Sequence, residues 1–290
     1  MESLINWGLL QKMGPASNPG IAGHDAESTE NMAKLASSFD HLAGFGTQYT
    51  TNQCNSLPLS TADSVLIVGC GSGRLALPIA KRVKKLTAFD ASERMLAVCK
   101  DNARKAEQDN IIFRRLDWSL PEPGKPGEKF DVVITTRSVG IEDIKRLNIL
   151  SRKYVFVIYP YDYPSLKDIQ HEMLLDVRGR ISREEDAKSQ RIYGYNTIFN
   201  MLYDMGLDPV MSLLNDGFER IYMTREDAYQ DLRKIALMSL EDFDNPLLDE
   251  DEDKIFRTNL EPYFSLEEDG KVKFFRESKT MVIGWKAKEI

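Results

Sequence analysis

Short apolar runs alternate with amphipathic stretches along the middle of the chain. Apolar runs typical of buried strands occupy residues 65–69, 85–89, 111–116, 130–136 and 153–159. Helical spacing of apolar residues follows at 74–83, 92–108 and 141–151, and Ser92 is expected to cap the second of these helices. Strands that alternate with helices predict a parallel sheet with helices on both faces. Continuous apolar strands agree with burial of both faces.

The pattern changes on either side of this region. Residues 13–25 are predicted to be a loop, and helices are predicted at 27–43 and 47–57. After residue 159 the spacing predicts a helix near 188–205, a strand at 208–214, a helix at 225–240 and a last strand at 279–285. Residues 241–253 hold eight acidic residues and no basic one, which favours a solvated face or loop.

Four parts of the chain are expected from this order. They are an N-terminal helical extension or lid at 1–60, a cofactor-binding core at 61–223, a helical insertion at 224–268 and the last core strand at 269–290. With 290 residues, 42% hydrophobic and 29% charged, the composition is typical of a soluble globular protein. The chain is long enough for one large domain or for one domain with an appendage.

Charge and cysteine content limit the partners. With a net charge of −7 and a pI near 5.2, the chain lacks the overall positive charge that would attract nucleic acid. A local basic patch is still compatible with this composition. Cys54, Cys70 and Cys99 are an odd, sparse set without metal-ligand spacing, so we expect reduced thiols in a cytoplasmic protein and no metal site. The first residues contain no basic region followed by an apolar core, which argues against a signal peptide. No apolar run reaches the ~20 residues of a membrane span.

Three glycines lie where the first strand passes into the first helix. Gly69, Gly71 and Gly73 occupy alternate positions of the stretch GCGSG. Glycine permits a positive φ and removes the Cβ that would keep a ligand away from the backbone. The helix start behind the glycines offers free N–H groups and a positive dipole end. Ligands bind at the carboxyl ends of strands in an open parallel sheet, so these glycines favour a ligand site over a simple tight turn.

Acidic residues at the next two strand ends indicate an adenosine ligand. The dinucleotide pattern G-x-G-x-x-G fails because Arg74 takes the third position, and a phosphate P-loop is absent. Asp90 could accept hydrogen bonds from both hydroxyls of a ribose, the alternative being a charge at a helix N-terminus. Asp117 could accept from an adenine amine, and Trp118 could offer its ring face or its indole N–H, or simply pack.

Four stretches together resemble the class I S-adenosylmethionine-dependent methyltransferases: VLIVGCGSG, LTAFDAS, FRRLDW and FDVVITT. The resemblance covers residues 60–160 strongly and the last strand weakly. It implies an α/β fold with a doubly wound, mostly parallel seven-stranded sheet and a reversed final strand near 279–286. It also implies S-adenosylmethionine as methyl donor and S-adenosylhomocysteine as product.

The resemblance assigns roles to individual residues. Asp90 would hold the ribose, Asp117 would meet the adenine, and residues 135–138 would border the methyl group. Many members carry an acid in the first strand, where this chain has Ile67, so backbone carbonyls around Gly69 would take its place. The implied cofactor-binding set is Tyr49, Gly69, Cys70, Gly71, Gly73, Asp90, Ala91, Met95, Asp117, Trp118 and Arg137.

Three members of this set have equally simple alternative roles. Met95 would pack on the adenine, although core packing explains it as well. Tyr49 would approach the methionine end of the cofactor, the alternative being a plain surface tyrosine. Arg137 would approach the methionine carboxylate or an acidic substrate, the alternative being a surface salt bridge.

The catalytic residues stay unassigned at this point. Methyl transfer needs alignment of the nucleophile, and it needs a base only when the nucleophile arrives protonated. Tyr159, Tyr161, Tyr163 and Asp162 could shape a substrate pocket after the fifth strand, and His171 is a candidate base or an exposed histidine. The NPPY-type tetrad of many amino-group methyltransferases is absent, and TTRS stands in its place.

A small-molecule acceptor is the favoured interpretation. It rests on the negative charge, on the helical segments that could cap a cleft, and on the tyrosines after the fifth strand. The basic cluster KRVKK at 81–85 is expected at the opposite edge of the sheet. RNA or protein methylation and a non-catalytic cofactor-binding module are the alternatives, and the sequence leaves the oligomeric state open.

Overall fold

The computed structural model describes residue 5 and residues 47–116, 118, 127–136, 143–161, 166–179, 195–237 and 247–289. The loop expected at 13–25 and the helix expected at 27–43 lie outside these residues. Among the described residues, no helix is long and apolar enough to cross a membrane.

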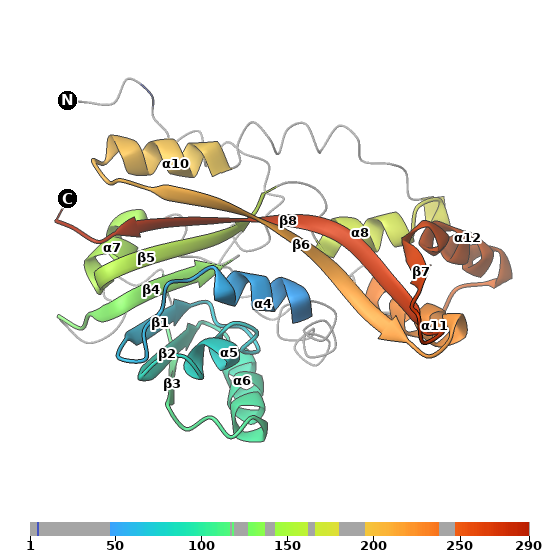
Figure 1. Ribbon diagram of the computed structural model, residues 1–290, viewed down its shortest axis with the longest axis horizontal. Coiled ribbons are helices and arrows are strands. Elements are labelled where there is room, and N and C mark those ends of the chain that lie inside the picture. The colour runs from blue at the N-terminus through green and yellow to red at the C-terminus, as the bar shows by residue number, and fades with distance from the viewer. Residues whose placement is uncertain are drawn as a thin grey trace.

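A mostly parallel sheet forms the centre of the molecule (Figure 1). Its five parallel strands are β1 (Ser64–Val68), β2 (Lys85–Asp90), β3 (Ile111–Arg115), β4 (Phe130–Thr136) and β5 (Ser151–Pro160). The order across the sheet is β3-β2-β1-β4-β5-β8-β6, and β8 runs antiparallel to both of its neighbours. The predicted mostly parallel sheet with a reversed final strand is therefore confirmed, although the sheet has eight strands rather than seven. The short strand β7 (Phe264–Leu266) pairs with β8 and was not expected.

Helices cover both faces of this sheet. The helices near one face are α4 (Thr47–Asn55), α5 (Ala76–Ala80) and α6 (Glu93–Lys105), and those near the other are α7 (Ile144–Leu150) and α10 (Tyr195–Asp204). Alternate strand residues such as Ile67 and Leu66 enter separate apolar clusters, one on each face. Ser92 caps α6 by accepting from the N–H of Met95 at 3.3 Å, as the sequence predicts.

Two strands at the edge are much longer than the sequence pattern predicts. β6 spans Val210–Tyr222 and β8 spans Val272–Lys286, and the two pair along their whole length. Pro160, the last residue of β5, pairs with Thr280. Residues 215–222 and 272–279 therefore continue past the carboxyl end of the parallel strands as a two-stranded ribbon (Figure 1).

A second layer of structure packs around this ribbon. It contains α8 (Leu166–Met173), the turn η2 (Val177–Gly179), α11 (Arg225–Ala236), α12 (Glu250–Leu260), the turn η3 (Glu261–Tyr263) and β7. Ile169, Leu232, Phe256 and Phe274 belong to its own apolar cluster, separate from the two clusters of the sheet. We call this region the ribbon module. The insertion expected at 224–268 lies in it, and α8 joins it from earlier in the chain.

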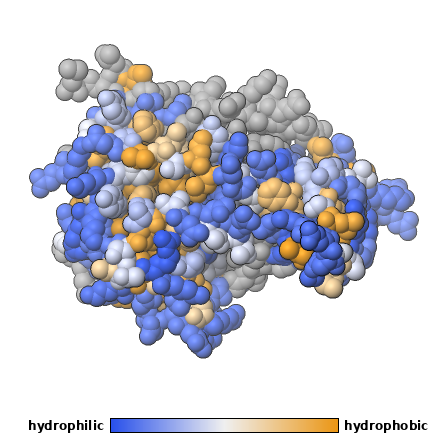
Figure 2. Space-filling view, in the orientation of Figure 1, coloured by the Kyte–Doolittle hydropathy of each residue, from blue (hydrophilic) through white to orange (hydrophobic). Residues whose placement is uncertain are grey.

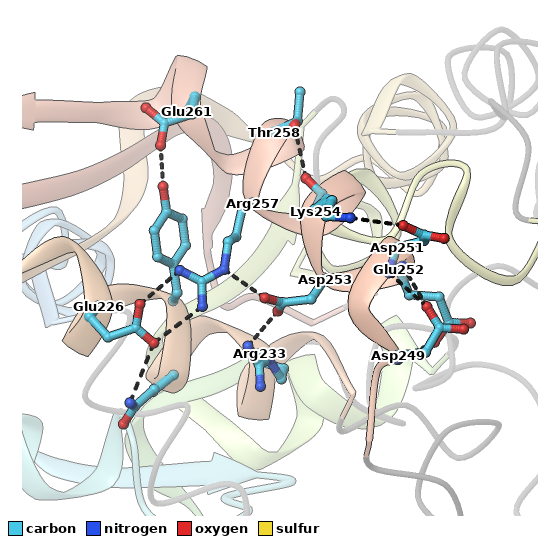
Figure 3. Close-up of polar contacts among 12 residues, drawn as sticks. Glu226, Arg233, Asp249, Asp251, Glu252, Asp253, Lys254, Arg257, Thr258 and Glu261 are labelled. Carbon is cyan, nitrogen blue, oxygen red and sulfur yellow. Dashed lines mark hydrogen bonds and ion pairs between the residues drawn. The ribbon is translucent and has the colours of Figure 1, made fainter.

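The acidic run takes a more ordered role than expected. Asp249 caps α12 by accepting from the N–H groups of Asp251 and Glu252 at 2.9 and 2.8 Å. Asp253 pairs with Arg233 and, at 2.6 Å, with Arg257 (Figure 3). The predicted solvated face is confirmed for Asp249, Glu250 and Asp251, which are exposed, whereas a loop is wrong for residues 250–253, which form the first turn of α12. Carboxylates at a helix N-terminus are stabilised by the free N–H groups and the dipole.

The first half of β6 is an exposed apolar edge. Val210, Met211 and Leu213 are exposed, and β6 ends the strand order of the sheet. Figure 2 shows hydrophobic residues where Figure 1 places this half of β6, on a face that is otherwise largely hydrophilic.

Candidate functional site

The turn between β1 and α5 is built from left-handed backbone. Gly69, Gly71 and Gly73 have φ values of 73°, 54° and 99°. The N–H groups of Gly69 and Cys70 both donate to the carbonyl of Phe89 in β2, each at 2.8 Å. This turn lies at the carboxyl end of β1, the edge at which open parallel sheets bind ligands.

Two of these glycines serve different purposes. A Cβ on Gly73 would lie 2.3 Å from Leu77 Cδ1 and 2.8 Å from the sulfur of Cys99, so this glycine permits close packing of the turn on α6. A Cβ on Gly71 would meet no atom within 4 Å. Packing therefore explains Gly73, whereas Gly71 leaves bare backbone facing open space, which fits the close approach of a ligand.

Asp90 ties the end of β2 to this turn. Its Oδ2 accepts from the N–H of Gly71 at 2.8 Å, and its Oδ1 accepts from the N–H of Ser92 at 2.9 Å. Burial raises the pKa of the Asp90 carboxyl, and the N–H groups of Ser92, Gly71 and Ala91 act in the opposite direction. A carboxylate has about four acceptor positions, so these two bonds leave room for the hydroxyls of a ribose.

Arg74, which breaks the dinucleotide pattern, connects the turn to α4. Its guanidinium donates to Thr50 Oγ1 at 3.2 Å and lies 5.0 Å from the centre of the Tyr49 ring. The Tyr49 ring also stacks on Phe218 of β6 at a centroid distance of 5.3 Å. Tyr49 is only 3% exposed, so the alternative of a plain surface tyrosine is wrong. Its contact with a cofactor stays a prediction.

The expected adenine side is described in part. Met95 is buried in the first turn of α6, and the Ala91 carbonyl accepts from Arg115 Nε at 3.3 Å. Trp118 is buried, the Arg146 guanidinium lies 5.1 Å from its ring, and its indole N–H has no partner among the described residues. Its donation to an adenine stays a prediction, and so does the alternative of simple packing. Asp117 and Arg137 lie outside the described residues.

The carboxyl ends of β4 and β5 hold further polar side chains. The hydroxyls of Thr135 and Thr136 are buried and have no hydrogen-bond partner in the part of the chain that the structure describes. Tyr159 and Tyr161 are half-buried and pack against the apolar cluster beneath α7. His171 is half-buried in α8, so it belongs to the ribbon module. Asp162 and Tyr163 lie outside the described residues.

Ile67 and the basic cluster at 81–85 lie where the sequence suggests. Ile67 is buried within β1, so it offers no polar contact to a ligand. The cluster at 81–85 follows α5 and leads into β2, at the edge opposite the glycine turn.

The three cysteines are buried, unpaired thiols. Burial raises the pKa of Cys54 to about 11. A hydrogen bond to Cys99, together with burial, raises the pKa of Cys70. The thiols of Cys54 and Cys70 therefore stay protonated at neutral pH, which suits a structural role rather than a nucleophilic one.

The sequence analysis missed a polar cluster between α4 and the ribbon. It consists of Asn52, Gln53, Asp216, Ser278 and Thr280, four of which are buried. They lie in polar stretches of the sequence, so no local signal marks them as buried.

The fold is Rossmann-like, and the glycine turn lies at the carboxyl edge of its sheet, where the sequence predicts an adenosine ligand. Residues 65–153 match the family model for the methyltransferase domain. These residues therefore form a methyltransferase domain, and the resemblance to the class I S-adenosylmethionine-dependent methyltransferases is confirmed for this part of the chain. Members of this family use S-adenosylmethionine as methyl donor. The open Cβ position of Gly71, the carboxylate of Asp90 and the indole of Trp118 fit that cofactor.

Individual relatives are distant. An uncharacterized protein of Haemophilus influenzae is 25% identical over 181 residues, which are 60% of this chain and 62% of that protein. A demethylmenaquinone methyltransferase of Tropheryma whipplei is 26% identical over 40% of this chain and 50% of its own length. The solved structure of the YcgJ protein from Bacillus subtilis covers 83% of this chain and 98% of its own, with 15% identity and a TM-score of 0.47. The chain thus spans less than two thirds of the curated relatives it matches.

Proposed function

We propose that this protein is a methyltransferase that binds S-adenosylmethionine and transfers its methyl group to a small molecule. The observation that carries the proposal is the bond between Gly71 and Asp90, which joins the bare glycine turn to a carboxylate at the ribose position. When bound, the cofactor would supply the methyl group. Tyr49, the three glycines, Asp90, Met95 and Trp118 would hold it, together with Asp117 and Arg137.

The ribbon module and the net charge support a small acceptor. The module lies beyond the carboxyl ends of the parallel strands, where it would roof the reacting groups together with the N-terminal residues. A net charge of −7 opposes long-range attraction of nucleic acid. A demethylmenaquinone methyltransferase among the relatives is named for a small-molecule substrate. We also infer a cytoplasmic location from the three unpaired thiols.

RNA methylation is the second candidate. A 23S rRNA methyltransferase of Aliivibrio salmonicida is 36% identical over 65 residues, which are 22% of this chain and 15% of that protein. The match covers too little of either protein to assign the same substrate to this chain. It does justify testing RNA as an acceptor in the experiment.

Binding and transfer are tested separately. Calorimetry with S-adenosylhomocysteine is expected to show one site per chain, and absence of binding would contradict the proposal at its root. Labelled S-adenosylmethionine is then offered with a metabolite extract, a protein extract and total RNA in parallel. Label is expected in the metabolite pool. Label in RNA or protein alone would replace the small acceptor with the corresponding alternative, and binding without any transfer would favour the non-catalytic module.

A further inference from the structure

Arg74 leaves the glycine turn from a fixed piece of backbone. Gly73, which precedes it, donates its N–H to the Cys70 carbonyl at 3.1 Å and accepts from the N–H of Leu77 at 3.0 Å. Leu75, which follows it, is 2% exposed. The Arg74 side chain is half-buried. The turn therefore fixes where this side chain begins, and the contacts of the guanidinium show where it ends.

The guanidinium contacts the first half of α4. It lies 5.0 Å from the centre of the Tyr49 ring and donates to Thr50 Oγ1 at 3.2 Å. A planar guanidinium can stack on an aromatic ring while its N–H groups donate to a neighbour, whereas a lysine ammonium is a point charge. Arginine therefore suits residue 74, because it holds two adjacent residues of α4 at once.

The Tyr49 ring is also held by the ribbon. It stacks on Phe218 of β6 with 5.3 Å between the ring centroids and 21° between the ring planes. Both side chains are buried. Burial raises the pKa of Asp216 in β6, and the charge of Arg74 acts in the opposite direction, so the guanidinium is within electrostatic reach of the ribbon. Arg74, Tyr49 and Phe218 thus form a continuous set of contacts from the glycine turn to the ribbon.

A second arginine holds the other end of α4. Arg82, which follows α5, donates to the carbonyl of Cys54 and, at 3.1 Å, to the carbonyl of Leu57. Between the two ends, the Asn52 amide donates to Asp216 Oδ1 at 2.8 Å. The helix would therefore stay docked without Arg74, but its first half would lose this link to the glycine turn.

We propose that Arg74 is a positioning residue, which holds Tyr49 of α4 beside the cofactor at the glycine turn. Arg74 acts through Tyr49 and does not itself contact the cofactor. The inference rests on the proposed function, because it describes how the cofactor site of the same reaction is completed. Where the dinucleotide pattern uses its third glycine for close packing of helix on strand, this chain uses Arg74 to hold α4.

The first experiment compares the two arginines that contact α4. Calorimetry with S-adenosylhomocysteine is expected to show at least tenfold weaker affinity in Arg74→Gln, and affinity within twofold of wild type in Arg82→Gln. Both variants are expected to melt at a lower temperature than the wild type. Unchanged affinity in Arg74→Gln, or an equal loss in both variants, would overturn the inference while leaving the cofactor proposal intact. Absence of binding by the wild type would contradict both.

The second experiment tests whether Arg74 acts through α4. Thr50→Val removes the acceptor of the guanidinium and keeps a side chain of similar shape. Its affinity is expected to fall at least threefold, and Arg74→Gln with Thr50→Val is expected to bind no more weakly than Arg74→Gln alone. In a Tyr49→Leu background, Arg74→Gln is expected to cost less than twofold.

Additive losses in either pair would mean that Arg74 acts on the cofactor independently of α4, which would refute the positioning role. If Tyr49→Leu does not fold, the pair with Thr50 decides.

A third measurement separates positioning from a general loss of structure. With labelled S-adenosylmethionine and the metabolite pool, the apparent KM of Arg74→Gln for S-adenosylmethionine is expected to rise at least tenfold, with kcat within threefold of wild type. A purely structural defect would instead reduce the amount of active protein, so kcat would fall and KM would stay unchanged. That result would count against the inference. If the wild type transfers no label, the proposed reaction has failed, and calorimetry alone decides the inference.

Discussion

The sheet with its glycine turn and the ribbon module are held together by different forces. In the sheet, buried apolar strands pack on both faces, and the turn is fixed by backbone N–H groups that donate to Phe89 and Asp90. The ribbon module has one apolar cluster under a network of charged side chains, of which Arg257 contacts both Glu226 and Asp253 (Figure 3). Backbone hydrogen bonds therefore fix the geometry of the first region, whereas pairs of charged side chains fix that of the second.

The carboxylates beside the proposed cofactor site and those on helices and turns of the ribbon module have opposite pKa shifts. Burial raises the pKa values of Asp90 and Asp216 beside the proposed site. Hydrogen bonds from Arg257 lower the pKa of Glu226, and those from Tyr229 and Arg225 lower the pKa of Glu261 in the module. The carboxylates of the module are paired with cationic or hydroxyl side chains. Those beside the proposed site are buried at a cost in folding free energy, which the binding of a ligand could offset. Such a division is typical of a functional site next to a structural element.

The largest expected effect comes from truncating a buried side chain in the apolar cluster of the ribbon module. Phe274 is 0% exposed and its ring lies 5.9 Å from Tyr263 and 6.0 Å from Phe264. Phe274→Ala is expected to cost about 3–5 kcal/mol of unfolding free energy, measured by urea denaturation. Affinity for S-adenosylhomocysteine is expected to stay within threefold of wild type, because the proposed cofactor site lies at the edge of the sheet and outside this apolar cluster.

The neighbouring ring provides the control. Phe275 is 42% exposed, and Phe275→Ala is expected to cost less than about 1 kcal/mol. If Phe274→Ala abolishes cofactor binding in protein that is still folded, the two regions are not separable, and the comparison fails.

The close packing of the glycine turn is tested by comparing alanine substitutions at two glycines that both have positive φ, one packed against neighbours and one in open space. Gly73→Ala forces a Cβ against Leu77 and Cys99 at φ 99°, and overpacking with left-handed strain is expected to cost about 2–4 kcal/mol. Gly127 has φ 72° and no atom within 4 Å of its Cβ position. Gly127→Ala is therefore expected to cost about 1–2 kcal/mol, from backbone strain alone. Equal losses in urea denaturation would mean that the turn tolerates a side chain at residue 73.

Removal of the Asp90 carboxylate is expected to have the next largest effect. Asp90→Ala removes the acceptor of the Gly71 and Ser92 N–H groups and of the predicted ribose hydroxyls. Hydrogen bonds to charged groups contribute about 1.5–3 kcal/mol each, so calorimetry is expected to show at least a tenfold weaker affinity for S-adenosylhomocysteine. Asp109→Ala, at an exposed position before β3, is the matched control and should bind as the wild type does. Unchanged affinity in Asp90→Ala would remove this residue from the site.

The sequence predicts the first region far better than the second. Five parallel strands, the cap at Ser92 and the reversed last strand follow from apolar runs and local signals that act within a few residues. The extra length of β6 and β8 does not follow from local signals, because apolar residues such as Phe274 are mixed with charged residues there. These segments become stable strands only when they pair with each other and the helices cover them. The contacts of Arg74 with α4 and the cluster around Asp216 likewise join residues far apart in the chain. No local pattern encodes them.

The smallest expected effects test the opposite pKa shifts. The raised pKa of Asp216 means that the folded state binds its proton more tightly than the unfolded chain does. Its charge therefore costs stability at neutral pH, and this cost disappears as the pH falls below the folded-state pKa toward the ordinary value of 3.8. Asp216→Asn should raise the melting temperature at pH 7, and the gain should vanish in acid.

Glu226 in the module should respond in the reverse direction. Because hydrogen bonds from Arg257 lower its pKa, its contribution is complete above the ordinary value of 4.5 and is lost as the pH falls through the lowered folded value. Glu226→Gln should lower the melting temperature slightly at pH 7 and have no effect in acid, since exposed ion pairs contribute little. Calorimetric scans of both variants between pH 3 and pH 7, at fixed ionic strength, measure the two slopes. Slopes of the same sign would contradict the opposite pKa shifts of Asp216 and Glu226.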